Sequence, residues 1–451
     1  MSPPKDAPPR FAWQRIAEFS DFPDWQAVSR RFEPLFARAA RLQAESPVKQ
    51  EAARIAAAHE SPLARATAAL DLVQQQVRYI YIGLNEGNLT PVGADLTWQR
   101  RYGDCKGKTA LLLALLDELG IKAEAVLVAN GGDDGLDQRL PNPGMFDHVL
   151  VRARIAGKLY WLDGTLPAVV PPTLSPSLPY RWVLPLSARG ETLEAIPWQP
   201  SEQPDQLVLY EIDARAGFEE PARIETSTIV RGPDALAEYL LYSSVTDEQL
   251  IQAMRQNAEG GGTWDTIDKV TWEFDEPTQA SVLTVTGTGP VEWKANRGGR
   301  YMTLPGGGFN PPGRRQRGSG QDQDAPFFTA PEFACHVTTV RLPEDTKTTD
   351  WSYNSHFDTV MFGRVYRRAF ERREGEITML RQSRVMRTEI SPQEAAADNA
   401  RLADFDNSMA RISHYPGDPL ELRSQESVPA TYAIDWLRND AACLAPLKTA
   451  R

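Results

Sequence analysis

Cysteine is scarce in this chain of 451 residues: there are only three, Cys105, Cys335 and Cys443. They lie far apart in the sequence, without Cys-x-x-Cys pairs or Cys/His clusters. From this spacing we expect neither a disulfide framework nor a structural zinc site, and we predict no metal and no cofactor. A free reactive thiol is compatible with the sequence.

Long apolar runs and an excess of positive charge are also missing. The longest apolar stretch, 110–116, is far shorter than the roughly 18 residues of a membrane helix. Lysine and arginine number 49 against 60 aspartates and glutamates, which gives a net charge of −11 and a field that repels phosphate backbones. We therefore expect a soluble protein without a nucleic-acid partner. Residues 1–10 have no apolar core of a secretion signal, so the compartment stays open.

Changes in composition predict an α+β fold with two main domains. Helical patterns and a few strands occupy the first part, and strand patterns dominate after residue 205. The ranges we predict are a Pro-rich lead (1–24), a mixed domain (25–195), a β-rich domain (205–412) with a flexible Gly/Pro/Arg-rich loop (297–325), and a C-terminal tail (413–451).

Several helix boundaries can be predicted from capping residues. Ser46-Pro47 and Ser61-Pro62 each place a capping hydroxyl before a proline, which is a helix-start signal. A first helix over 25–42 contains Pro34, which we expect to kink or divide it. In the β-rich domain we expect a helical insertion over 235–257. The sequence from Ser391 to Glu394 is a capping box, from which we expect a helix reaching about Ile412.

Cys105 carries the strongest chemical signal. It stands in the sequence Tyr-Gly-Asp-Cys-Lys-Gly-Lys (102–108), directly before a buried Leu/Ala-rich helix that Gly120 ends. The free N–H groups and the positive end of the helix dipole favour a thiolate over a thiol, and we expect Lys106 and Lys108 to add positive charge there. The same N–H groups can hold an oxyanion formed when sulfur attacks a carbonyl.

A hairpin downstream offers a base and an orienting acid. Strands over 146–155 and 158–163 are joined at Ala156-Gly157, and a two-residue turn there pairs Leu150 with Asp163. His148 and Asp163 then share one face of the hairpin as diagonal neighbours, about 7–8 Å apart in the backbone. A register shifted by one residue would place them on opposite faces. The carboxylate can accept the imidazole N–H and leave the other ring nitrogen for Cys105.

Each of these residues also has an ordinary structural interpretation. A cysteine beside a leucine helix is usually a small core residue, a strand histidine is usually structural, and Asp163-Gly164 is a common turn pair. Their combination favours a catalytic role, because a cysteine at a helix start, a strand histidine and a strand aspartate across one hairpin rarely occur together by chance.

These motifs resemble the bacterial transglutaminase-like domain of the papain-like cysteine fold. The resemblance rests on Tyr102–Lys106, on the helix that ends in Gly-Ile-Lys-Ala (120–123), on Phe-Asp-His-Val (146–149) and on Tyr-Trp-Leu-Asp-Gly-Thr (160–165). It covers roughly residues 25–190. The strands further on look like the β-rich tail of large bacterial proteins in which a DUF3857-type β-domain precedes this core. No such N-terminal β-domain is visible in the chain.

The resemblance implies Cys105 as nucleophile, His148 as base and Asp163 as orienting acid. The family often has Asp where this chain has Gly107, and Asn where it has Asp147, differences that can alter the geometry. The second oxyanion donor stays open between Gln99, Trp98 and Tyr102. A surface position for Gln99 and core packing for the two aromatic residues are the structural alternatives.

We therefore predict a cysteine protease or amidase that cleaves peptide or side-chain amides through a thioester, with hydrolysis favoured. The alternatives are a cross-linking transglutaminase and a catalytically silent binding or scaffold module. The expected partner is a peptide or protein substrate, and the oligomeric state is open. The resemblance suggests the bacterial periplasm or cell envelope.

Overall fold

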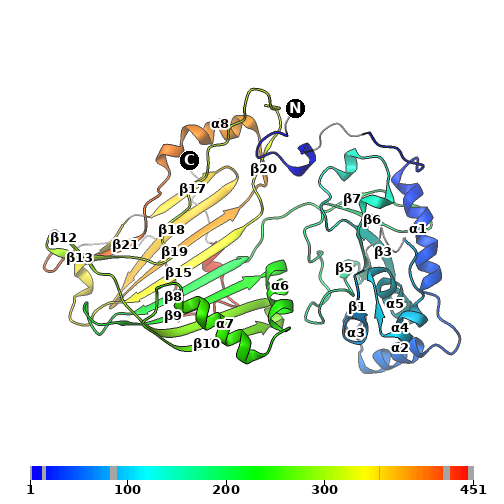
Figure 1. Cartoon of the computed structure of the whole chain (residues 1–451), viewed down its shortest axis with the longest axis horizontal. Helices are drawn as coiled ribbons and strands as arrows, with labels where there is room; N and C mark the ends of the chain where they lie inside the picture. Colours follow the sequence, from blue (N-terminus) through cyan, green and yellow to red (C-terminus); the bar gives the residue numbers. More distant parts are fainter. Residues whose placement is uncertain (1–2, 13–16, 82–88, 355, 420–426, 445–451) are drawn as a thin grey trace. The chain divides into compact units, whose positions relative to one another are not determined.

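The structure, a computed structural model, describes residues 3–12, 17–81, 89–354, 356–419 and 427–444. The fold is mixed α+β, with a second part rich in strands (Figure 1). Contacts divide the chain into two units. We call residues 13–198 the Cys105 unit, and residues 1–12 together with 199–451 the β-rich unit. The N-terminal residues 1–12 therefore belong with the second half of the chain, which the predicted lead over 1–24 did not anticipate.

Helices form the first half of the Cys105 unit. Those in its described part are α1 (Trp25–Ala39), α2 (Pro47–Ala58), α3 (Pro62–Gln76), α4 (Ala94–Arg100) and α5 (Cys105–Glu118). Ser46 and Ser61 accept hydrogen bonds from the N–H groups of Val48 and Ala64, which confirms both predicted helix starts. Helix α1 continues through Pro34 and is not divided by it.

The Cys105 unit also contains an antiparallel sheet of five strands. Its order is β5 (Lys158–Leu162), β4 (His148–Ile155), β3 (Ala123–Val128), β6 (Trp182–Pro185) and β7 (Glu194–Ala195). A short parallel pair, β1 (Arg78–Tyr79) and β2 (Tyr102–Gly103), leads into α5. Helix α5 packs on α2, α3 and β4 and buries Leu111, Leu112, Leu115 and Leu116. The buried leucine helix predicted from the sequence is confirmed.

The β-rich unit is built on a sheet of eight strands. The order is β10 (Thr266–Asp275), β11 (Ala280–Gly289), β9 (Ala222–Arg231), β8 (Gln206–Asp213), β15 (Phe333–Arg341), β19 (Glu376–Val385), β18 (Arg364–Arg373) and β17 (Phe357–Met361). Neighbouring strands are antiparallel except β8 and β15, which are parallel. Smaller sheets join β12 (Lys294–Asn296), β13 (Gly299–Thr303), β21 (Arg411–His414) and β16 (Trp351–Tyr353), and pair β14 (Phe327–Phe328) with β20 (Glu389–Ile390).

Apolar side chains cover both faces of the large sheet. On one face, which we call the tail face, Cys335 and Val337 pack against Val428, Trp436 and Cys443 of the C-terminal segment. The opposite face packs against a second cluster that includes Met302, Leu304 and Ile412. Helices α6 (Gly232–Tyr242) and α7 (Asp247–Glu259) pack near β9, β10 and β11 (Figure 1). The predicted insertion over 235–257 is therefore two helices.

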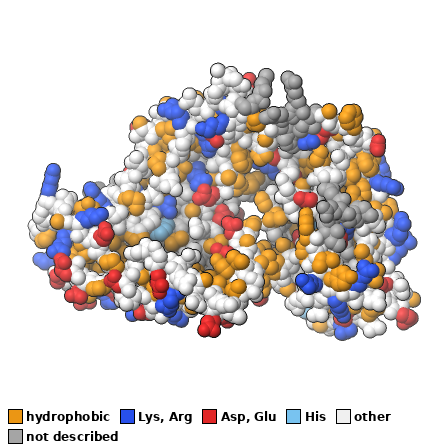
Figure 2. Space-filling view, in the orientation of Figure 1, with side chains coloured by type: hydrophobic (Ala, Val, Ile, Leu, Met, Phe, Trp, Pro, Cys, Tyr) orange, Lys and Arg blue, Asp and Glu red, His pale blue; other side chains and the backbone are white. Residues whose placement is uncertain are grey.

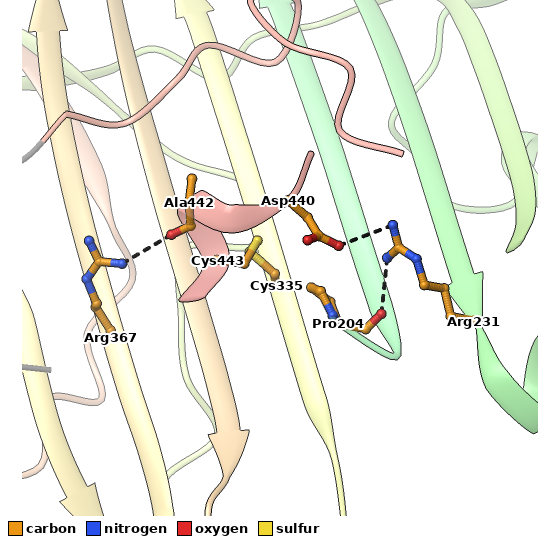
Figure 3. The surroundings of a disulfide bond; sticks show 7 residues. All are labelled: Pro204, Arg231, Cys335, Arg367, Asp440, Ala442 and Cys443. Carbon is orange, nitrogen blue, oxygen red and sulfur yellow. Dashed lines mark hydrogen bonds and ion pairs between the residues drawn. A yellow bond between two sulfur atoms is a disulfide. The ribbon is translucent and has the colours of Figure 1, made fainter. Parts of the chain in front are cut away.

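A disulfide joins Cys335 of β15 to Cys443 in the C-terminal segment (Figure 3). This corrects our expectation that the widely spaced cysteines form no disulfide framework, because the fold brings together two residues that are 108 positions apart in the sequence. Around the bond, Arg231 lies 3.3 Å from the Asp440 carboxylate and donates to the Pro204 carbonyl. The C-terminal segment is thus bound to the sheet, and Cys105 is the free cysteine.

Two further expectations about the β-rich unit were wrong in detail. Within the predicted flexible loop 297–325, Gly299–Thr303 is strand β13, and the buried Arg317 donates to the carbonyls of Pro326 and Lys5. The Ser391 capping box is confirmed, but helix α8 (Pro392–Ala400) ends well before Ile412. Ile412 instead lies in strand β21, where it pairs with Met302. Long-range pairing decides both cases, and local composition does not record it.

The N-terminal segment is attached to the β-rich unit by specific bonds. Arg10 forms two hydrogen bonds to the carboxylate of Glu389, at 2.8 and 2.6 Å, and Asp6 accepts the N–H of Phe328 through its carbonyl.

On the visible face of the molecule, acidic and basic side chains are interspersed (Figure 2). Among the described residues, the helices are too short or too polar to cross a bilayer.

Candidate active site

The sequence predicted Cys105 at or near the start of a helix, and the structure places it as the first residue of α5. The helix begins there because the Asp104 carboxylate accepts the N–H of Gly107 at 3.0 Å and acts as N-cap. Upstream, Ile80 donates to the carbonyl of Gly103, so the β1–β2 pair fixes the approach of the chain to the helix. Cys105 is 2% exposed and packs in an apolar cluster with Phe146 and Val149.

The register of the β4–β5 hairpin agrees with the prediction. Val151 pairs with Leu162 and Ile155 with Lys158, around a turn at Ala156-Gly157 in which both residues have positive φ. This conformation matches a two-residue hairpin turn. Extending the pairing by one residue sets Leu150 opposite Asp163, which is the register expected from the sequence.

The imidazole of His148 links two of the predicted site residues. Its Nε2 lies 2.8 Å from Oδ2 of Asp163, and the Cys105 side chain is close enough to the ring to raise the pKa of His148. Since Nε2 faces the carboxylate, Nδ1 is the ring nitrogen that remains for the sulfur. The structure therefore brings Cys105, His148 and Asp163 together in a row.

Burial and charge act against each other on these groups. Burial by itself would lower the pKa of His148, but the Asp163 carboxylate and the nearby Cys105 side chain outweigh it and raise this pKa to about 10. For Asp163, burial raises the pKa, and the His148 charge and the bonds from Thr165 more than compensate, so that the pKa is lowered overall. The protonated imidazole and the ionised carboxylate thus favour each other.

Asp163 is held in place by contacts that sequence reasoning did not identify. Its Oδ1 accepts the N–H of Thr165 at 2.9 Å and the hydroxyl of Thr165 at 2.6 Å, and its backbone carbonyl accepts from Gln74 at 3.0 Å. With Oδ1 fixed in this way, Oδ2 is directed at His148. An Asp followed two positions later by Thr is the signal that predicts such a turn.

The two lysines near Cys105 do not act as the sequence analysis expected. Lys106 is buried and its Nζ lies 2.5 Å from the Asp104 carboxylate, which compensates its charge. Lys108 is equally buried and donates to the carbonyl of Val77. Burial lowers the pKa of Lys108 to about 8 against the opposing attraction of Asp163. Lys108 therefore interacts electrostatically with Asp163, whereas Lys106 pairs with Asp104, the N-cap residue of α5.

The three candidates for a second oxyanion donor occupy different environments. Trp98 is buried in the core with Leu111 and Leu112, and the guanidinium of Arg101 lies 3.7 Å from its ring centroid. Gln99 is exposed, and Tyr102, in strand β2, is 45% exposed. Their roles as oxyanion donors stay predictions.

The two departures from the family pattern have local consequences. A Cβ atom at Gly107 would lie 3.0 Å from the hydroxyl of Thr97, so the backbone and Thr97 lie close together there. Asp147 binds the N–H groups of Asn130 and Gly131 with its two carboxylate oxygens, at 2.7 and 3.0 Å. Among the residues that the structure describes, no group of three or more His, Cys, Asp or Glu side chains is placed to hold a metal ion.

Comparisons with known proteins reveal only slight similarities. No protein family model and no curated protein matches this sequence. The chain is similar to the solved structure of a "putative protease" from Parabacteroides distasonis, with a TM-score of 0.44 and 14% identity, over 89% of this chain and 63% of that one. It is more distantly similar to a two-domain M1 zinc metallopeptidase variant bound to L-tryptophan (TM-score 0.18, 11% identity, 49% of this chain and 44% of that one). Such slight similarities carry no argument about function.

Proposed function

We propose that the protein is a cysteine-dependent acyl-transfer enzyme that acts on peptide or side-chain amides. The observation that carries the proposal is the position of His148, which is hydrogen-bonded to Asp163 at 2.8 Å and lies next to Cys105 at the start of α5. A nucleophile, a proton carrier and an orienting carboxylate in this order can perform covalent acyl transfer.

In the proposed reaction, the sulfur of Cys105 attacks the amide carbon and the carbonyl electrons move onto oxygen. The helix cap uses the N–H groups of Gly107 and Lys108, which leaves those of Cys105 and Lys106 to donate to this oxyanion. Gln99, Trp98 and Tyr102 stay the candidates for a further donor. His148 then gives its proton to the departing amine, the C–N bond breaks and a thioester remains. Water attacks the thioester after losing a proton to His148, and the acid leaves.

We favour water over an amine as the acceptor, since nothing in the sequence marks a channel for an amine. In that case the protein is a protease or amidase, and with an amine acceptor it is a cross-linking transglutaminase. A transglutaminase-like core of the papain-like fold, within the Cys105 unit, is part of this proposal. It rests on the motifs around the three residues and on their arrangement.

An extracytoplasmic location, the periplasm or cell envelope of a bacterium, also belongs to the proposal. The disulfide between Cys335 and Cys443 supports it, because disulfides form and persist in oxidising compartments.

Activity on labelled casein tests the proposal. We expect the wild-type protein to release labelled peptides, Cys105→Ala and His148→Ala to lose the activity, and His59→Ala, a histidine at the end of α2, to retain it. Equal melting temperatures of the wild-type protein and Cys105→Ala would show that the loss is chemical.

Two outcomes separate this proposal from its alternatives. Incorporation of a labelled amine into casein, with little release of peptide, would identify a transferase. If neither activity is seen, and mass spectrometry detects no acyl group on Cys105 after incubation with a bacterial lysate, the silent binding module is favoured.

A further inference from the structure

Three basic side chains lie in a row across the centre of the large sheet. His336 of β15 pairs with Arg381 of β19, and Arg381 pairs with Arg368 of β18. Residues directly opposite each other point to the same face, so these three lie side by side on the face opposite to the tail face. The two arginines carry like charges in such positions and repel each other, so a compensating group would stabilise the arrangement.

Burial raises the free-energy cost of placing these three side chains side by side. The side chain of Arg368 is fully buried and His336 is 8% exposed, whereas Arg381 is partly exposed. The Nε atoms of Arg368 and Arg381 and the Nε2 atom of His336 are buried and have no hydrogen-bond partner in the described part of the chain. Buried polar atoms without partners are rare in native proteins, and an unseen water or ion is a common explanation.

The partners of the two arginines are unequal. Arg368 donates to the carbonyls of Gly307 and Ser408, at 2.9 and 3.0 Å, and to the carboxylate of Asp406. Arg381, in contrast, makes neither a hydrogen bond nor an ion pair to another described residue. Its guanidinium lies 5.5 Å from the ring centroid of Phe309, which is also 5.9 Å from the guanidinium of Arg368. The face of an aromatic ring attracts a cation, but it does not replace a hydrogen-bond acceptor for the N–H groups at the edge of the guanidinium.

Charge around the row does not balance. Burial, and then the Arg381 charge, lower the pKa of His336 to about 3, so this imidazole is neutral. Asp406 compensates Arg368, and the nearby Glu332 is bound to Arg364 at 2.6 Å. Glu332 also attracts Arg381, but among the described residues no carboxylate forms an ion pair with Arg381.

We propose that Arg381, together with the Nε of Arg368, forms a binding site for a small oxyanion, a phosphate or a carboxylate group. The planar guanidinium fork matches the oxygen spacing of both groups. The ring of Phe309 would form a wall of the site, and the neutral His336 would bound it on the β15 side. The bound anion would supply the missing negative charge and accept hydrogen bonds from the Nε groups of Arg368 and Arg381, which now have no partner. This proposal is independent of any reaction at Cys105.

Calorimetric titration and thermal unfolding with sodium phosphate and with sodium acetate test the site. Sodium chloride at matched ionic strength is the reference. We expect saturable binding of one anion per chain by the wild-type protein, and a rise in melting temperature with phosphate or acetate beyond that with chloride. The stronger of the two anions identifies the group that the site prefers. Binding of neither anion by the wild-type protein would overturn the proposal.

Two variants locate the binding. Arg381→Gln removes the fork, and we expect an affinity loss of about ten-fold or more. Because this variant also removes an uncompensated charge, we expect it to melt no lower than the wild type in chloride. Arg223→Gln, an exposed arginine of β9, should bind like the wild type. Equal effects of phosphate on all three proteins would mean an adventitious ion only, and would contradict the proposed site. The titration of the wild-type protein decides the matter even if Arg381→Gln does not fold.

Discussion

His148 and Asp163 face each other, Nε2 to Oδ2, at 2.8 Å, although one begins β4 and the other follows β5. The turn at Ala156-Gly157 sets this relationship, because it fixes the register of the hairpin between them. A change of one residue in that turn would move the two side chains to opposite faces. The geometry of the candidate site thus depends on a turn at the far end of the hairpin.

The first prediction concerns the reactivity of Cys105. With Cys335 and Cys443 joined, alkylation of the unreduced protein reports on this thiol alone. Because His148 lies next to Cys105 and can take up the thiol proton, we expect a small alkylating reagent to label Cys105 faster in the wild-type protein than in His148→Ala. Mass spectrometry of quenched samples measures the rate, and Cys105→Ser is the control for labelling elsewhere. Identical labelling rates of the wild-type protein and His148→Ala would contradict the prediction.

The second prediction separates Asp163 from its support, Thr165. Asp163→Asn leaves the size of the side chain unchanged but can hold His148 in the wrong tautomer, so we expect kcat for amide hydrolysis to fall about 10³–10⁴-fold. Thr165→Val removes the 2.6 Å hydrogen bond to Oδ1 and keeps the charge, so a loss of about ten-fold is expected. Steady-state kinetics should show both effects in kcat and little change in KM. An Asp163→Asn variant with near-normal kcat would exclude Asp163 as the orienting group.

The third prediction is a pH dependence of stability. The pKa of His148 is about 10 in the folded protein, against about 6.5 when unfolded. Its stabilising contribution is therefore complete below about pH 6.5 and is lost as the pH rises towards 10. Denaturant unfolding of the wild-type protein and His148→Gln should show a difference in unfolding free energy that shrinks by at most about 1.4 kcal/mol per pH unit over this range.

Lys108 provides a check on this measurement. Its pKa is lowered to about 8, so the cost of burying its charge disappears between about pH 8 and 10.4 and both proteins gain stability there. This contribution is common to the two proteins and cancels in the difference between them. A difference that is constant or grows from pH 7 to 9 would show that His148 is not charged in the folded protein.

The parts of the structure that could be predicted are those set by local sequence. The start of α5 at Cys105 follows from Asp104 and the leucine pattern, and the hairpin register follows from the two-residue turn. Capping pairs such as Ser391 with Glu394 likewise located a helix start. In each case the residues that decide the conformation lie within a few positions of it.

Features set by long-range contacts were not predictable. The path of the C-terminal segment across β15 decides the pairing of Cys335, and the partner of strand β21 decides that Ile412 is extended. The compensation of Lys106 by Asp104 was missed for a different reason. Charges two positions apart can interact or diverge, and the direction of their side chains is fixed only by the cap itself.

The last prediction concerns the bond between Cys335 and Cys443. It closes a loop of 108 residues, and in the chain-entropy account a loop of this size stabilises the folded state by about 2–5 kcal/mol. We expect Cys335→Ser, Cys443→Ser and the double variant to lose the same amount, because each removes the one bond. Thermal unfolding is measured with and without a reducing agent. The reducing agent should lower the melting temperature of the wild-type protein and leave those of the three variants unchanged. A reduced wild-type protein as stable as the oxidised one would mean that the contacts of Trp436 and Asp440 are sufficient to hold the C-terminal segment on the sheet.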